Sequence, residues 1–288
     1  MFVLSDLQLI LYMKKKDNSF NMTTGNPLKN ILIFAIPIMM SGLIQQGYNV
    51  ADTYIVGRYI SANALAAVGS VGPMSSLLMG LAMGVTGGFA IPIAQAFGAG
   101  DRKRTNHYAG NAIALTIIIS LTIMSLSLFL VKPILTLLGT PKDIFDDAQL
   151  YVSIIYAGAI FTTLYNVMAS ILRALGDSKA PLKFLAVTAV LNVFLNYFTI
   201  AILGVDGAAI STVLSQLVSC ILCVIYIRSR KEMLNITFKD FKINKETAVL
   251  MLKMGVPMSL QFSITGIGSM VLQSTINTYG PSVMAGFT

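Results

Sequence analysis

Long apolar stretches, each near the length of a membrane crossing, alternate with short polar segments along this chain. A helix needs about 20 apolar residues to cross a bilayer. Seven runs reach that length, at residues 31–56, 64–94, 110–135, 148–174, 181–203, 207–227 and 248–277. The segments between them are rich in glycine, proline and charge, which are typical of helix ends and turns. The pattern predicts an all-α polytopic membrane protein with six complete spanning helices and a seventh near the end of the chain.

The start of the chain is echoed near its end. Pro37 stands 220 residues before Pro257 in a similar apolar context, and ALAAVG at 64–69 resembles VMAGFT at 283–288. Six helices per copy would give both copies the same orientation, as in transporters with parallel repeats. Chance recurrence of apolar, proline and methionine residues is the other explanation. The repeat predicts four parts: an N-terminal tail at 1–25, a six-helix N-lobe at 26–227, a cytoplasmic linker at 228–246 and the start of a C-lobe at 247–288.

Composition and charge agree with a membrane protein. Of the 288 residues 55% are hydrophobic and 11% are charged, against about 25% charged in soluble domains. With the N-terminus inside, 17 of the 20 Lys and Arg residues fall on the inner side, and three fall outside: Arg58, Lys132 and Lys142. Such asymmetry sets membrane topology. The net charge of +8 therefore predicts orientation and contacts with anionic lipids, and no nucleic-acid partner.

One of the twelve carboxylates, Asp52, falls inside a predicted span. A charge there costs at least roughly 2.5–3.5 kcal/mol and usually marks function. Asp52 could instead reach water at the outer helix end, or pair with Arg58. Helical spacing places Gln45, Asn49 and Asp52 on one face, with Tyr48 bordering Asp52. A polar stripe of this kind needs a polar partner or a water-filled cavity.

Two later helices carry matching polar ladders. One lies in residues 181–203 and consists of Thr188, Asn192 and Asn196, with Tyr197 beside it. The other lies in residues 207–227 and consists of Thr212, Gln216 and Ser219. Hydroxyl groups of this kind also serve as packing contacts between membrane helices, but the asparagine pair favours a cavity.

A carboxylate among amide and hydroxyl oxygens can hold a small hard cation such as sodium. It can also take up a proton when it is buried. Either ion could compete with an organic cation for the single charge, which would couple ion entry to substrate exit. No cofactor is expected.

Two backbone features bear on motion and packing. Pro37 interrupts the hydrogen bonding of the helix that carries Asp52, so it can kink that helix and is a hinge candidate. Gly80, Gly84 and Gly88 are spaced by four residues, which predicts a close approach by a neighbouring helix.

Six segments together resemble one known family. They are AIPIMMSGLIQQGYNVADTYIVG, ALAAVG, QAFGAGDRKR, LRALGDSKAP, NVFLN and GVDGAAISTVLSQ. From about residue 26 to the end, the chain resembles the multidrug and toxic compound extrusion (MATE) transporters. The resemblance implies two six-helix lobes in the cytoplasmic membrane of a bacterium. It also implies export of cationic amphipathic compounds in exchange for sodium or protons. This chain would hold the N-lobe and the first helix of the C-lobe, and its missing C-lobe would be its partner.

The resemblance also implies roles for single residues. Asp52 matches the helix-1 aspartate implicated in cation coupling, Asn192 matches a nearby helix-5 asparagine, and Thr212 matches a helix-6 threonine. Asn196 departs from the pattern, because many relatives have aspartate there. The substitution keeps a ligand oxygen but removes the second acid. The implied sodium site is therefore Asp52, Asn192, Asn196 and Thr212, with Gln45, Tyr48, Asn49, Thr188 and Tyr197 as candidate lining of the cavity.

Other functions fit the sequence less well. A flippase for lipid-linked precursors or polysaccharides, from the same superfamily, should carry basic residues inside the cavity to meet pyrophosphate. A membrane-bound enzyme would need a paired acid and base or a metal cluster, and Asp52 stands alone. A closed alternating-access path needs both lobes, so the isolated chain is expected to be inactive.

Overall fold

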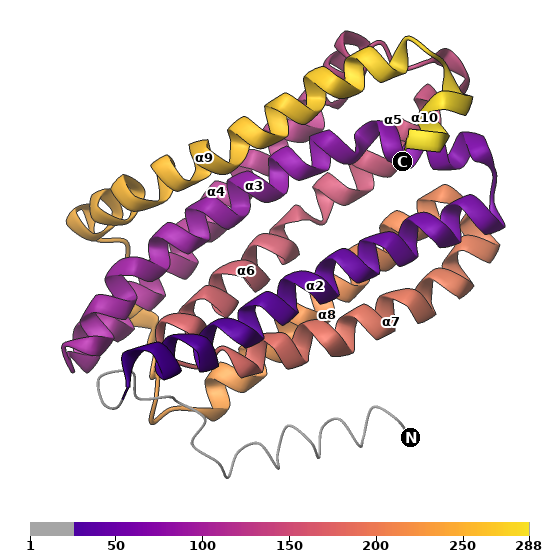
Figure 1. Cartoon of the computed structure of the whole chain (residues 1–288). Coiled ribbons are helices and arrows are strands. Elements are labelled where there is room, and N and C mark those ends of the chain that lie inside the picture. The colour runs from indigo at the N-terminus through magenta and orange to yellow at the C-terminus, as the bar shows by residue number, and fades with distance from the viewer. Residues whose placement is uncertain (1–25, 288) are drawn as a thin grey trace.

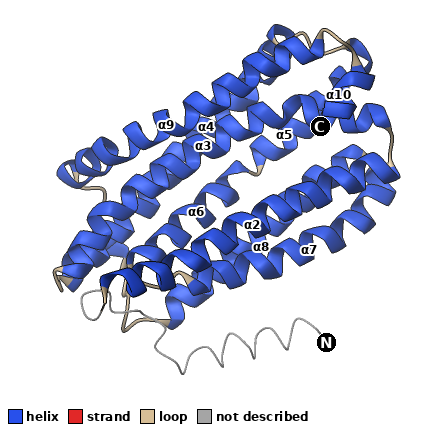
Figure 2. Ribbon diagram, viewed as in Figure 1, coloured by secondary structure: helices blue, strands red, loops and turns tan. Residues whose placement is uncertain are grey.

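The computed structural model describes residues 26–287. The predicted N-terminal tail at 1–25 lies outside the described residues, as does residue 288. Helices make up this part of the chain, and Figure 2 shows only short loops between them, with no strand in residues 26–287. The elements are α2 (Pro27–Tyr59), α3 (Ala62–Gly98), α4 (Arg102–Leu137), α5 (Lys142–Ala157), α6 (Ala159–Ala174), α7 (Lys179–Leu203), α8 (Val205–Ser229), the 3-10 helix η2 (Phe238–Phe241), α9 (Lys245–Asn277) and α10 (Pro281–Phe287).

The helices account for every predicted span. Six of them are long and apolar enough to cross a membrane on their own, and α5 and α6, which meet at an angle of 43°, are long and apolar enough together to make a seventh. The sequence predicted one continuous helix at 148–174, but the structure breaks it at Gly158. A Cβ at Gly158 would lie 2.3 Å from Cγ2 of Val213, so the bend brings the backbone directly against α8. The chain is a multi-pass membrane protein.

Side-chain caps and a glycine mark where several of these helices begin and end. The side chains of Asn26, Ser61, Asp101 and Asn244 accept hydrogen bonds from the first turns of α2, α3, α4 and α9, which satisfies backbone donors that have no partner inside the helix. Gly176 has a φ of +85° just after α6. Glycine adopts this left-handed conformation readily, and it stops the helix before α7 begins.

The long helices form two groups (Figure 1). In one group α2 lies beside α7, and α8 packs against α7. In the other, α3 packs extensively along α9 and also against α6 and α4. Buried apolar side chains such as Phe89, Ile171 and Tyr226 join α3, α6 and α8 in the largest core cluster.

Glycine permits the close contact between α3 and α9. A Cβ at Gly84 would lie 2.3 Å from Cα of Ser259, and a Cβ at Gly88 would lie 2.4 Å from Cα of Gly255. The hydroxyl of Ser259 donates to the carbonyl oxygen of Leu81 at 3.1 Å. The glycine spacing predicted such an approach, and the structure confirms it and identifies α9 as the neighbour.

Helices α7 and α8 form a tight hairpin. A Cβ at Gly207 would lie 2.3 Å from the carbonyl oxygen of Thr199, so the two backbones touch. The hydroxyls of Thr199 and Ser211 are hydrogen-bonded at 2.6 Å, and Thr199 also donates to the carbonyl of Gly207 at 2.9 Å. These contacts fix α7 against α8 near the turn.

Candidate functional site

Asp52 is the centre of a polar group that three helices form. It extends from α2 toward the α7–α8 hairpin and is partly buried. The amide of Asn196 on α7 donates a hydrogen bond to Asp52 Oδ1. The hydroxyl of Thr212 on α8 donates to Asp52 Oδ2 at 3.3 Å. Each carboxylate oxygen therefore has one donor from the hairpin.

Asn192 completes the group. Its Nδ2 lies 3.4 Å from the hydroxyl oxygen of Thr212, and its Oδ1 accepts from Nδ2 of Asn196 at 3.4 Å. Asn192 and Asn196 are buried, at 2% and 0% exposure. The structure thus brings together Asp52, Asn192, Asn196 and Thr212, which the sequence selected from three separate helices.

One oxygen in this group has no hydrogen-bond partner. Oδ1 of Asn196 is buried and accepts no bond from any described residue, and an unpaired buried acceptor of this kind costs about 1–3 kcal/mol. Together with the carboxylate of Asp52, Oδ1 of Asn192 and the hydroxyl of Thr212, it supplies the kind of oxygen set that binds a hard cation. The group carries one negative charge, which a single monovalent cation would neutralise.

Thr188 lies on α7 one turn before Asn192, and it forms no hydrogen bond with Asp52. Its hydroxyl donates to the carbonyl of Phe184 at 2.9 Å and accepts from Ser219 on α8 at 2.8 Å. The bond between Thr188 and Ser219 joins the two arms of the hairpin. Thr188 therefore lies in an interhelical packing contact.

A second polar patch adjoins Asp52 on the side of Tyr48. The hydroxyl of Tyr48 lies close to the side chains of Gln45 and Gln216. It is also close enough to Asp52 to interact with its charge. Gln216 is 7% exposed, and its Oε1 accepts no bond from the described residues. Tyr151 on α5 is also close enough to Asp52 to interact with its charge. Sequence reasoning missed Tyr151, because nothing in its local pattern shows that α5 comes near α2.

Two other predicted lining residues form hydrogen bonds with partners other than Asp52. Asn49 is exposed on α2, and its amide donates to Gln46 at 3.4 Å. Tyr197 is 58% exposed, and its hydroxyl lies 2.6 Å from that of Tyr59. This contact links α2 and α7 at the end of α2, where the two rings are 5.3 Å apart.

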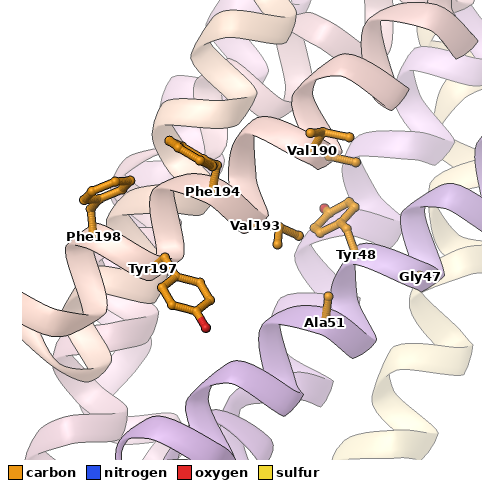
Figure 3. A pocket seen from close by; sticks show the side chains of 9 residues that line it. Gly47, Tyr48, Ala51, Val190, Val193, Phe194, Tyr197 and Phe198 are labelled. Atoms are coloured by element: carbon orange, nitrogen blue, oxygen red, sulfur yellow. The ribbon is translucent and has the colours of Figure 1, made fainter.

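An apolar pocket of about 610 Å³ lies between α2 and α7 (Figure 3). Its lining consists of Gly47, Tyr48, Ala51, Ala189, Val190, Val193, Phe194, Tyr197 and Phe198. Ala51 precedes Asp52 in the chain, and Val193 follows Asn192. The ring of Tyr48 lines the pocket and also packs against the core. Tyr48 therefore stands between the apolar pocket and the polar group around Asp52.

Pro37 lies within α2, four turns before Asp52. The hydroxyl of Ser41 donates to the carbonyl of Pro37 at 2.9 Å. Large apolar side chains on this half of the helix are exposed, including Ile36, Met39 and Leu43. Pro37 itself is buried, so one face of this half of α2 is packed and the other face is exposed.

Comparisons with known proteins agree with this architecture. Residues 37–198 match the MatE family. A probable multidrug resistance protein YpnP from Bacillus subtilis is 31% identical, over 93% of this chain and 60% of that protein. The multidrug export protein MepA from Staphylococcus saprophyticus is 24% identical, over 95% of this chain and 61% of that protein. The chain spans about three fifths of the length of these curated relatives.

A solved structure shares the fold. It is described as the outward-facing conformation of a multidrug resistance MATE family transporter of the MOP superfamily. The two chains superpose with a TM-score of 0.80 and 29% sequence identity, over 90% of this chain and 58% of the other.

Proposed function

Since the chain belongs to the MatE family, whose members are transporters and not enzymes, we propose that it works in the cation-coupled export of cationic amphipathic compounds. The observation that carries the proposal is the environment of Asp52. This single carboxylate meets donors and acceptors from α7 and α8, and the buried Oδ1 of Asn196 beside it has no partner. Relatives named as multidrug resistance and multidrug export proteins support the substrate class.

The coupling step follows from charge balance. Asp52 can be neutralised by sodium, with oxygens of Asn192, Asn196 and Thr212 as further ligands, or by a proton on its carboxyl group. An organic cation can also neutralise it. Because the group has one negative charge and no second acid, the binding of one cation weakens the attraction for another. Entry of the ion from outside therefore promotes release of the organic cation.

The apolar pocket between α2 and α7 suits this class of substrate. A cationic amphipathic compound needs an apolar surface for its body and a negative charge for its head. The described chain offers aromatic and aliphatic side chains on one side of Tyr48 and the carboxylate of Asp52 on the other. Replacing water by such apolar contacts stabilises the bound compound by about 25 cal/mol per Å².

The membrane orientation is part of the proposal. Of the described Lys and Arg residues, all but Arg58, Lys132 and Lys142 lie at the end of the bundle where α2 begins, or within two turns of it. We call this the basic end, and we place it on the inner side of the cytoplasmic membrane of a bacterial cell. A second lobe that begins with α9 completes the transport path.

The decisive experiment removes the charge of Asp52 in the full-length transporter. Asp52→Asn keeps the size of the side chain but has no charge to neutralise, so it should abolish export of a cationic dye from proteoliposomes with an imposed sodium or proton gradient. Asp143→Asn, which changes an exposed carboxylate in the first turn of α5, is the matched control and should leave export unchanged. Gradient-driven export by Asp52→Asn at the rate of the native protein would refute the proposal.

Thr212→Ala distinguishes coupling to sodium from coupling to protons. If sodium is the coupling ion, removal of a ligand hydroxyl should raise the sodium concentration needed for half-maximal export. If the proton is the coupling ion, sodium should have no effect on either protein. Thr212→Ser keeps the hydroxyl and should behave like the native protein.

A further inference from the structure

The segment between α8 and α9, residues 230–244, is firmly attached to the helix bundle, and we call it the strap. Figure 1 shows it at the end of the bundle where α4 begins. The guanidinium of Arg102 donates to the carbonyl oxygens of Glu232 and Met233 at 2.8 and 2.9 Å. Leu234 is 4% exposed and belongs to the largest core cluster. The first half of the strap is therefore fixed by a charged donor and an apolar anchor.

The second half of the strap lies directly on α4. Asn111, which is fully buried, donates to the carbonyl of Asp240 at 2.9 Å and accepts from the backbone of Asn244 at 2.9 Å. A Cβ at Gly110 would lie 2.5 Å from the same carbonyl of Asp240, so only glycine permits this approach. The side chain of Asp240 caps η2 through the backbone and hydroxyl of Thr237, both at 2.7 Å.

This fixed segment holds a phenylalanine out into its surroundings. Phe238 is 95% exposed, and Phe241 and Ile243 are 37% and 40% exposed. A segment with these hydrogen bonds holds Phe238 in one place, outside the core. The exposed side chains of Lys239 and Lys242 stand beside the apolar ones.

The charge around Phe238 is positive. Residues 228–246 contain six Lys or Arg residues and three carboxylates, and one of those carboxylates, Asp240, is engaged within the strap. The start of α4, on which the strap rests, adds Arg102, Lys103 and Arg104. Arg104 pairs with Asp101 at 3.7 Å. Exposed aromatic and basic side chains thus occur together on one surface.

We propose that the strap is a membrane-anchoring surface, which inserts Phe238 into the interfacial region of an anionic leaflet while Lys239 and Lys242 bind lipid phosphates. The strap joins the end of one spanning helix to the start of the next, so it lies at the level of the head groups. Aromatic side chains favour this region, and basic side chains are attracted to anionic lipids. An apolar insertion combined with basic residues binds a membrane more strongly than either alone. This proposal does not depend on what is transported.

The test uses the absence of tryptophan from the 288-residue chain. Phe238→Trp introduces the only indole, and because position 238 is exposed the change should not disturb packing. The protein is reconstituted into vesicles of phosphatidylcholine, with or without phosphatidylglycerol. With phosphatidylglycerol, tryptophan emission should move to shorter wavelength and should be quenched by lipids brominated on their acyl chains. High salt should reduce this quenching, because it screens the lysines.

Two variants serve as controls. Phe238→Trp combined with Lys239→Gln and Lys242→Gln should lose most of the additional quenching that phosphatidylglycerol produces. Phe129→Trp replaces an exposed side chain within the apolar stretch of α4, and it should be quenched equally in both kinds of vesicle. Emission from Phe238→Trp that resembles indole in water would overturn the proposal, and so would quenching that is independent of phosphatidylglycerol.

Discussion

Replacing Gly84 by alanine would place a methyl group where the backbones of α3 and α9 already touch. The new Cβ would lie 2.3 Å from Cα and 2.4 Å from the backbone nitrogen of Ser259. Ordinary contacts begin at 3.4 Å, and backbone atoms cannot rotate aside as a side chain can. The two helices would therefore have to separate by about 1 Å at this point.

The cost follows from the lost contact. A gap of about 1 Å removes up to half of the dispersion attraction between facing atoms, and overpacking of a close interface typically costs about 1–3 kcal/mol. The bond from Ser259 to the carbonyl of Leu81 would lengthen as well. Alanine returns up to about 1 kcal/mol through its higher helix propensity. We expect Gly84→Ala to lower the stability by about 1–2 kcal/mol net, or about 2–8 °C in Tm.

The buried thiols provide the assay. Cys220 and Cys223 are free and buried, so a fluorogenic thiol reagent reports unfolding of the detergent-solubilised protein on heating. Gly72→Ala is the matched control, because it lies in the same helix and a Cβ there meets nothing within 4 Å. Gly72→Ala should match or exceed the native Tm. A Tm for Gly84→Ala as high as that of Gly72→Ala would refute the reasoning.

Two further substitutions can be measured with the same reagent. Asn111→Ala should lower the stability by about 1–3 kcal/mol, because the strap loses the buried amide that holds it. The control is Asn49→Ala, at an exposed site, which should have little effect. Equal Tm values for Asn111→Ala and Asn49→Ala would contradict the docking of the strap. Tyr226→Phe should cost a similar amount, because its hydroxyl donates to the buried Asp177 at 2.6 Å. Exposed Tyr54→Phe is its control, and an unchanged Tm for Tyr226→Phe would count against that bond.

The helices could be predicted because a bilayer restricts which backbone structures can cross it. Every backbone group in the hydrocarbon must bond within its own helix, so apolar length determines where helices form. The break at Gly158 could not be predicted, since glycine is common in membrane helices and only the neighbouring Val213 requires its small size. In the same way, the stripe at Gly80, Gly84 and Gly88 indicated a close neighbour, but which helix would pack there is a property of the whole fold.

The candidate site could be predicted where helical spacing determines which side chains lie on the same face of a helix. Asn192 and Asn196 are four residues apart on one helix, and their side chains meet in the structure. Tyr197 is next in the chain to Asn196, but a rotation of about 100° per residue turns it toward the apolar pocket. The approach of Tyr151 to Asp52 depends on the packing of α5 against α8 and α3, and no local pattern in the sequence carries that information.

The α7–α8 hairpin divides the proposed site into a stationary and a displaceable half. Asn196 and Thr212 belong to two helices whose backbones touch at Thr199 and Gly207, so they keep a constant separation. Asp52 belongs to a third helix, α2, in which Pro37 removes a backbone hydrogen bond and a Cβ at Gly42 or Gly47 would meet nothing within 4 Å. Under the proposed coupling, a change of the bound cation is not easily accommodated within the hairpin, and α2 is the helix that would shift in response. The position of α2 would then depend on which cation is bound. The hydrogen bond between Tyr59 and Tyr197 restrains this movement at the C-terminal end of α2.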